Sequence, residues 1–266
     1  MNPLDEVRED LRAEQEALGA VLVRLPDEAW DRPTHAPGWL VRDQVAHLAS
    51  FDEAATRAIL DPAAFRAEVA AANAEGANLE ADYLARGRSM APRQVLAWWE
   101  SASQGLIEAS RTLDSRTRMP WYGPDMSGIS FLTARLMETW SHGLDITDVV
   151  DVPRPCTDRI RHVVFLGART RSFSYVNRGL APNEEEVFLD LVLPSGTRWT
   201  SGDPAAANRI HGPAEDFAQV VCQRRHIADT DLRVEGAAAS EWMALAQAFA
   251  GPPGQGRKPG EFPRTA

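Results

Sequence analysis

The segment Leu136-Met-Glu-Thr-Trp-Ser-His-Gly-Leu-Asp145 places a carboxylate and an imidazole, those of Glu138 and His142, four residues apart. On an α-helix, side chains at this spacing lie on one face and within reach of each other. Apolar residues share that face by the same three- and four-residue spacing, namely Phe131, Ile146 and Val149. A charge among apolar neighbours requires a partner, because burying an unpaired charge is costly. A divalent metal ion is one such partner, and this pair would supply about half of its ligands.

A second amphipathic segment, Trp39 to Phe51, offers a third ligand. Its sequence is Trp-Leu-Val-Arg-Asp-Gln-Val-Ala-His-Leu-Ala-Ser-Phe, and His47 lies on the stripe shared with Leu40 and Phe51. Taken alone, a histidine at such a position is more often a core residue that hydrogen-bonds a carbonyl group. Together with the pair on the other helix, it predicts a site of two histidines and one carboxylate. Such a set suits Zn²⁺ with an open coordination position, and also Fe²⁺, Ni²⁺ or Mn²⁺. The alternative is a buried Glu138–His142 hydrogen bond without metal.

Length and composition set the broad class. The chain has 266 residues, of which 44% are hydrophobic and 25% charged, as in a globular protein large enough for two domains. A formal net charge of −10 argues against nucleic acid as the main partner, because phosphate binding needs a basic surface. No apolar run is long enough to span a membrane, and the acidic start of the chain does not resemble a signal peptide. We therefore expect a cytoplasmic protein without nucleic-acid or membrane partners.

Cys156 and Cys222 are too few for a disulfide framework and are predicted to be core residues.

Residues 1–152 are predicted to form a helical domain. Leucines recur every seven residues at its start, which is typical of a bundle seam, at Leu4, Leu11, Leu18 and Leu25. Further helices are expected around His47, after Asp61-Pro62, over about 92–113 and around Glu138. Four main helices and one extra predict an antiparallel four-helix bundle, an architecture whose interior commonly holds metal ions.

Residues 153–250 have a different periodicity, and we expect a linker helix (about 157–175) followed by a small α+β domain. Val187–Leu193 and Thr197–Thr200 flank a Pro-Ser-Gly turn and predict a β-hairpin. A helix over about 213–225, a strand over 231–235 and a helix over 238–249 complete the order β-β-α-β-α. The whole chain is thus assigned to the α+β class. Glycine and proline predict an irregular tail over residues 251–266.

These features together resemble the mycothiol-dependent maleylpyruvate isomerase family, in which a DinB-like metal-binding bundle precedes a sterol-carrier-like domain. The resemblance rests on Pro37-Gly-Trp39 leading into Val45-Ala-His47-Leu48, on the spacing Glu138-x-x-x-His142-x-x-Asp145, and on the order of the two domains over about residues 1–250. It implies that His47, Glu138 and His142 bind the divalent metal, usually zinc in this family.

The resemblance also implies a thiol cosubstrate, mycothiol, and a small electrophilic substrate that bears a carboxylate. The metal would hold the thiol as its nucleophilic thiolate for an isomerisation or a thiol transfer. In the family a substrate-anchoring arginine comes from the C-terminal domain, and Cys222-Gln-Arg-Arg-His226 offers Arg224 and Arg225 here. We also consider an enzyme that activates water, and a non-catalytic, metal-stabilised protein that binds a small molecule.

Four further residues are candidates near the centre. Asp145 is either a carboxylate that orients a ligand or a plain surface residue. Trp39, Trp121 and Tyr122 are candidates for lining a cleft for the thiol and the substrate. Trp121 and Tyr122 lie in a loop rich in glycine and proline just before the Glu138 helix, where a substrate lid would sit.

Overall fold

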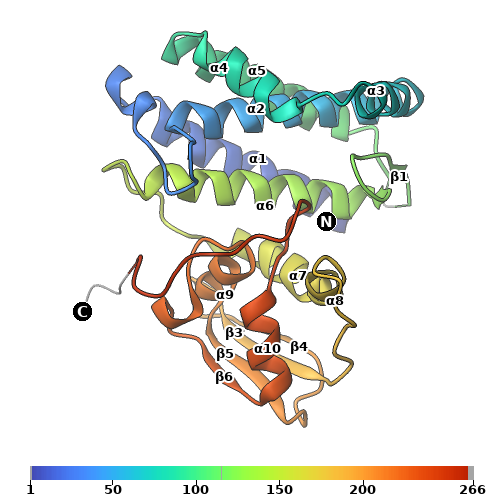
Figure 1. The fold of residues 1–266 in the computed structure, drawn as a ribbon, viewed down its shortest axis with the longest axis vertical. Helices are drawn as coiled ribbons and strands as arrows, with labels where there is room; N and C mark the ends of the chain where they lie inside the picture. The colour runs from blue at the N-terminus through green and yellow to red at the C-terminus, as the bar shows by residue number, and fades with distance from the viewer. Residues whose placement is uncertain (1, 115, 263–266) are drawn as a thin grey trace. The chain divides into compact units, whose positions relative to one another are not determined.

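The computed structural model describes residues 2–114 and 116–262, and the chain divides into two compact units, Met1–Arg154 and Pro155–Ala266. The first is helical and the second combines helices with a sheet (Figure 1). The predicted α+β class is confirmed. Within the described residues, no helix is both long and apolar enough to cross a membrane.

Four long helices build the first unit, α1 (Pro3–Leu22), α2 (Val41–Leu60), α5 (Pro92–Ser110) and α6 (Gly128–Thr147). Helix α2 packs against α5 and α6, and α1 packs against the same two helices, so the four close into a bundle (Figure 1). The leucine seam is buried as its spacing predicts, at Leu4, Leu11 and Leu18. Leu25 is the exception in one respect, because α1 ends at Leu22 and Leu25 reaches the core from the following turn. The contact of α2 with α6 brings the predicted metal ligands together.

Helix α2 begins where the chain can satisfy its first backbone groups. Gly38 has a φ of 80°, a left-handed conformation that glycine adopts without strain, and it turns the chain after Pro37. Asp43 then accepts a hydrogen bond from the backbone N–H of Leu40 at 2.8 Å and caps the helix. Arg88 pairs with the same carboxylate at 2.7 Å. The Pro-Gly-Trp stretch thus sets both the start of α2 and the position of Trp39.

Two shorter helices follow α2, where one was expected. Asp61 caps α3 (Pro62–Glu75) by accepting a hydrogen bond from the N–H of Ala64 at 3.0 Å, as the Asp-Pro pair predicts. Gly76, with a φ of 66°, ends it, and Asn78 caps α4 (Leu79–Arg88). Helix α4 packs against α2 and buries Tyr83. A short hairpin, β1 (Arg118–Met119) with β2 (Met126–Ser127), holds the loop before α6.

The second unit is a four-stranded sheet in the order β4-β3-β5-β6. Strand β3 (Val187–Val192) pairs antiparallel with β4 (Arg198–Ser201), which is the predicted hairpin, and parallel with β5 (Asn208–Pro213). Strand β6 (Arg233–Glu235) pairs antiparallel with β5. Helices α9 (Ala214–Val221) and α10 (Ala237–Leu245) pack on this sheet. The observed order is β-β-β-α-β-α, and strand β5 was not predicted from the sequence. Its sequence Asn-Arg-Ile-His-Gly-Pro lacks an apolar alternation, and pairing on both sides makes it a strand.

Three expected helices differ from the structure. The last, α10, ends at Leu245 rather than near residue 249. The linker helix is interrupted at Thr170 and consists of η2 (Asp158–Ile160), α7 (Arg161–Arg169) and α8 (Arg171–Val176). Helix α9 ends at Val221 rather than near Arg225, because Gln223 has a φ of 57° and reverses the chain. Residues 251–262 form neither helix nor strand, and residues 263–266 of the predicted tail lie outside the described residues.

Candidate metal centre

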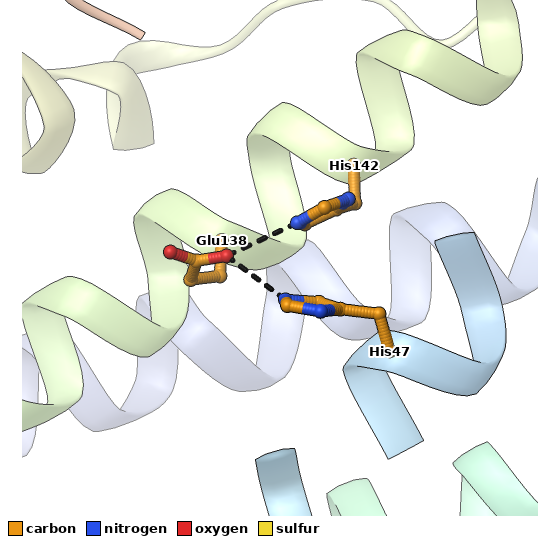
Figure 2. A group of neighbouring side chains, drawn as sticks. All are labelled: His47, Glu138 and His142. Atoms are coloured by element: carbon orange, nitrogen blue, oxygen red, sulfur yellow. Dashed lines mark hydrogen bonds and ion pairs between the residues drawn. The ribbon is translucent and has the colours of Figure 1, made fainter. Parts of the chain in front are cut away.

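The three predicted ligands come together on facing helices of the first unit. Helix α2 contributes His47, and α6 contributes Glu138 and His142 (Figure 2). Nε2 of His47 lies 3.2 Å from Oε2 of Glu138, and Nε2 of His142 lies 3.1 Å from the same oxygen. The four-residue spacing accounts for the second contact, and the packing of α2 on α6 brings in the first.

The spacing of these atoms fits a metal ion. Donor atoms bound to a tetrahedral ion at about 2.0–2.2 Å lie roughly 3.3–3.6 Å from one another. The two distances of 3.1 and 3.2 Å lie just below that range. Among the described residues, no further His, Cys, Asp or Glu joins this group. The Glu138 side chain is 22% exposed, so solvent reaches one side of the group. Three donors with one accessible side are the pattern of a catalytic rather than a closed structural site.

The protonation states of His47 and Glu138 are also suited to metal binding. Burial and the neighbouring His142 lower the pKa of His47 to about 3, so this imidazole is neutral at neutral pH. Burial by itself would raise the pKa of Glu138, but hydrogen bonds with His142 and His47 outweigh it and hold that pKa well below its usual range. A neutral imidazole and an ionised carboxylate are the forms that bind a divalent metal.

Each histidine has a second partner on the ring nitrogen that faces away from the group. Nδ1 of His142 lies 2.5 Å from Oε1 of Gln44, one residue of α2 that the sequence analysis did not single out. Nδ1 of His47 lies 3.2 Å from the hydroxyl of Tyr83 on α4. Burial, followed by nearby Glu80 and Glu138, raises the pKa of Tyr83, so its hydroxyl keeps its proton. Gln44 and His47 are three apart on α2, which is the one signal in the sequence that links them.

Asp145 lies behind the His142 ring, with Oδ2 at 3.9 Å from Nδ1. Asp145 is 1% exposed, so the alternative that it is a plain surface residue is wrong. The distance is too long for a hydrogen bond, and the direct partner of Nδ1 is Gln44 instead.

The aromatic candidates lie at two distances from the centre. The Trp39 ring stacks against His142 with 5.9 Å between ring centroids and 16° between planes, and the Phe51 ring lies 4.5 Å from that of His47. Trp121 and Tyr122 contact Phe51 instead, at 6.0 and 5.6 Å. They also contact Phe65 of α3, and Tyr122 is 39% exposed. Trp39 thus flanks the histidines directly, while Trp121 and Tyr122 form an outer layer.

The candidate arginines belong to the second unit, in the turn after α9. Their backbone N–H groups both donate to the carbonyl oxygen of Gln219, at 2.8 Å for Arg224 and 3.3 Å for Arg225. The Arg225 guanidinium lies 3.9 Å from the centroid of the Phe262 ring. Arg225 lines a cavity of about 290 Å³ within this unit, together with Arg178 and Arg257, and Arg224 is not among the lining residues.

Comparisons with known proteins agree with this architecture. Residues 11–147 match the family model of the mycothiol maleylpyruvate isomerase N-terminal domain. Uncharacterized proteins from two strains of Mycobacterium tuberculosis are each 41% identical to this chain over 248 residues, which cover 93% of this chain and 96% of the relative.

Solved structures share the fold at low sequence identity. The crystal structure of the mycothiol-dependent maleylpyruvate isomerase is 17% identical, with a TM-score of 0.53 over 84% of this chain and 90% of that chain. A histidine-to-alanine variant of that enzyme is 15% identical, with a TM-score of 0.54 over the same shares. The family model spans more than half of the chain, and its residues include both helices of the candidate metal centre. The chain therefore belongs to the mycothiol-dependent maleylpyruvate isomerase family.

Proposed function

We propose that this protein is a metal-dependent enzyme that uses a low-molecular-weight thiol, mycothiol, to isomerise a small electrophile or to transfer the thiol to it. The observation that carries the proposal is the convergence of two imidazole nitrogens on one carboxylate oxygen, at 3.2 and 3.1 Å, with one side open to solvent. His47, Glu138 and His142 would hold the ion, with zinc as the first choice and iron, nickel or manganese as alternatives.

The charge of the ligand set favours a thiolate as the further ligand. Two neutral imidazoles and one carboxylate contribute a single negative charge, so a divalent ion there keeps a net positive charge. When bound, such an ion supplies a Lewis-acid position at which a thiol loses its proton and becomes a nucleophile. The low pKa of His47 matters here, because this ligand needs no deprotonation near neutral pH.

The surrounding rings would restrict what reaches the metal. Trp39 and Phe51 stand directly against the two histidines and keep water from those sides. Trp121 and Tyr122, on the loop between β1 and β2, would contact the thiol or the substrate further out. An apolar surround of this kind strengthens the electrostatic effect of the metal on a bound thiolate.

Anchoring of a carboxylate substrate is assigned to the second unit. Arg225 is preferred over Arg224 because it lines the cavity that also contains Arg178 and Arg257. A guanidinium binds a carboxylate through two parallel hydrogen bonds, and this is the role proposed for Arg225. Local positive charge is needed because the chain as a whole carries −10.

Two experiments in sequence test this function. Elemental analysis of the purified protein should find about one divalent ion per chain, and a panel of small electrophiles should then be assayed with and without mycothiol. Turnover that needs both the metal and the thiol supports the proposal. Turnover with metal and water alone would favour the water-activating alternative, for which the 22% exposure of Glu138 is the supporting observation. Metal binding without turnover on any electrophile, with or without the thiol, would favour a non-catalytic role.

A further inference from the structure

We infer that Gln44 is a positioning residue for the metal ligand His142: Thr34 orients the Gln44 amide, and the amide oxygen selects the tautomer of His142 whose Nε2 is available to the metal. The inference rests on the proposed metal site and deepens it. The residues that carry it come from the turn before α2, from α2 itself and from α6.

The orientation of the Gln44 amide follows from Thr34. The Thr34 hydroxyl donates its hydrogen to the carbonyl oxygen of Trp39 at 3.0 Å. A hydroxyl has a single hydrogen, so toward Gln44 it acts as an acceptor. The group of Gln44 that lies 2.9 Å from this hydroxyl must therefore be the NH₂ group. The amide oxygen consequently faces the other way, toward His142.

The tautomer of His142 follows from the amide oxygen. That oxygen lies 2.5 Å from Nδ1 of His142 and has no hydrogen to give, so Nδ1 is the donor. A neutral imidazole carries one ring hydrogen, and Nε2 is then left with a lone pair. This lone pair points at the centre of the group, 3.1 Å from Oε2 of Glu138. Two electron-rich atoms at this distance need a proton or a cation between them: the hydrogen bond to Glu138 supplies the proton in the metal-free protein, and a metal ion would replace it.

The hydrogen-bond partner of His47 does not select its tautomer in this way. Its Nδ1 faces the Tyr83 hydroxyl at 3.2 Å, and a hydroxyl donates or accepts as required. Tyr83 therefore permits either tautomer of His47, whereas Gln44 permits one tautomer of His142. Gln44 is 0% exposed, so water does not take over its role when the side chain is replaced. Partners of this kind commonly contribute about 10- to 100-fold to metal affinity.

The test is zinc affinity, measured by competition with a chromophoric chelator. Gln44→Leu, which removes the acceptor at nearly constant size, should bind zinc about 10- to 100-fold more weakly than wild type. Gln44→Glu, which keeps an acceptor oxygen toward Nδ1, should bind at least ten times more tightly than Gln44→Leu. The matched control is Gln15→Leu, a buried glutamine of α1 in the same unit, which should bind as wild type does.

A second readout reports the tautomer itself. Histidine ¹⁵N NMR of the metal-free protein should find a hydrogen on Nδ1 of His142 in wild type, and this hydrogen should be lost from Nδ1 in Gln44→Leu. If Gln44→Leu does not fold, Thr34→Val replaces it: the amide is then free to turn, and zinc affinity should fall about 10-fold.

The outcomes distinguish a failure of the proposed function from a failure of the inference about Gln44. A wild-type protein that binds no zinc would overturn the proposed function, while the NMR measurement would still decide the role of Gln44. A wild-type protein that binds zinc, with Gln44→Leu binding as tightly as Gln15→Leu and with His142 unchanged in tautomer, would overturn the inference and leave the proposed function intact.

Discussion

The guanidinium of Arg154 lies against Gly143, the residue that follows the proposed metal ligand His142. A Cβ atom at position 143 would come within 2.2 Å of Nη1 of Arg154. Arg154 donates a hydrogen bond to the carbonyl oxygen of Trp140 at 2.7 Å and pairs with Glu14 of α1 at 3.2 Å. The absence of a side chain at Gly143 thus lets Arg154 link α6 to α1 one residue from the candidate metal centre.

Gly143→Ala should therefore lower the free energy of unfolding, by about 1–3 kcal/mol, because the new methyl group must displace a buried guanidinium. Denaturant titration measures this change. Gly105→Ala in α5 is the matched control, since a Cβ there meets only Thr56 Oγ1 at 3.8 Å. That control should be neutral or stabilising by up to about 1 kcal/mol, as expected for alanine in a helix. Equal effects of the two substitutions would contradict the role of Gly143.

Metal content should depend on the three ligands of the centre. His142→Ala removes one nitrogen donor from the group and should lose most of the bound ion, measured by elemental analysis after dialysis. His35→Ala, at an exposed histidine outside the group, should keep the wild-type content. Full metal content in His142→Ala would place the site elsewhere.

Removal of the metal should lower the melting temperature. The ion binds the folded chain and not the unfolded one, so its loss destabilises the protein by mass action, on the order of a few kcal/mol. A chelator added to wild-type protein should shift the thermal transition downward. The same chelator should leave His142→Ala unchanged, and a wild-type midpoint that does not move in a verified metal-free sample would argue against a formed site.

The metal-free protein should lose stability as the pH falls below about 6.5. The pKa of His47 is about 3 when folded and has its ordinary value of 6.5 when unfolded, so between these values only the unfolded chain binds the proton. The free energy of unfolding then falls with decreasing pH, by at most about 1.4 kcal/mol per pH unit for one group. The lowered pKa of Glu138 acts in the same direction below its ordinary value of 4.5.

Chemical denaturation at pH 7, 6 and 5 measures the slope of the free energy of unfolding against pH, and His47→Gln should flatten it. Parallel curves for the two proteins would show that His47 is not the group responsible.

Replacement of the substrate anchor should affect turnover without affecting the metal. Arg225→Ala should keep its metal content and lose about 2–4 kcal/mol of transition-state stabilisation on a carboxylate substrate, read from kcat/KM. Arg225→Lys should recover only part of this, because an ammonium group lacks the two-pronged geometry of a guanidinium. Arg224→Ala is the comparison. Wild-type kinetics in both alanine variants would show that neither arginine takes part in the reaction.

Features with short sequence separation were predictable from the sequence. The four-residue spacing of Glu138 and His142 determines that both lie on one helical face, and the Asp61-Pro62 pair determines where α3 begins. The hairpin of β3 and β4 follows from a turn between two apolar runs. The placement of His47 was predictable as well, because its stripe marks the inner face of α2. In each case the interacting groups are close along the chain or share one periodic face, so local geometry is sufficient.

The partners that complete the centre were decided by tertiary packing. Gln44 lies 98 positions from His142, and Tyr83 lies 36 positions from His47, and neither residue type indicates such a contact by its pattern. The position of Arg154 and strand β5 were also decided by packing. In the sequence, only the glycine at position 143 indicates that another group approaches there. Strand β5 is a strand because β3 and β6 pair with it. Periodicity specifies which face of an element turns inward. It does not specify which residue of another element that face meets, because this depends on how the helices and strands pack against one another.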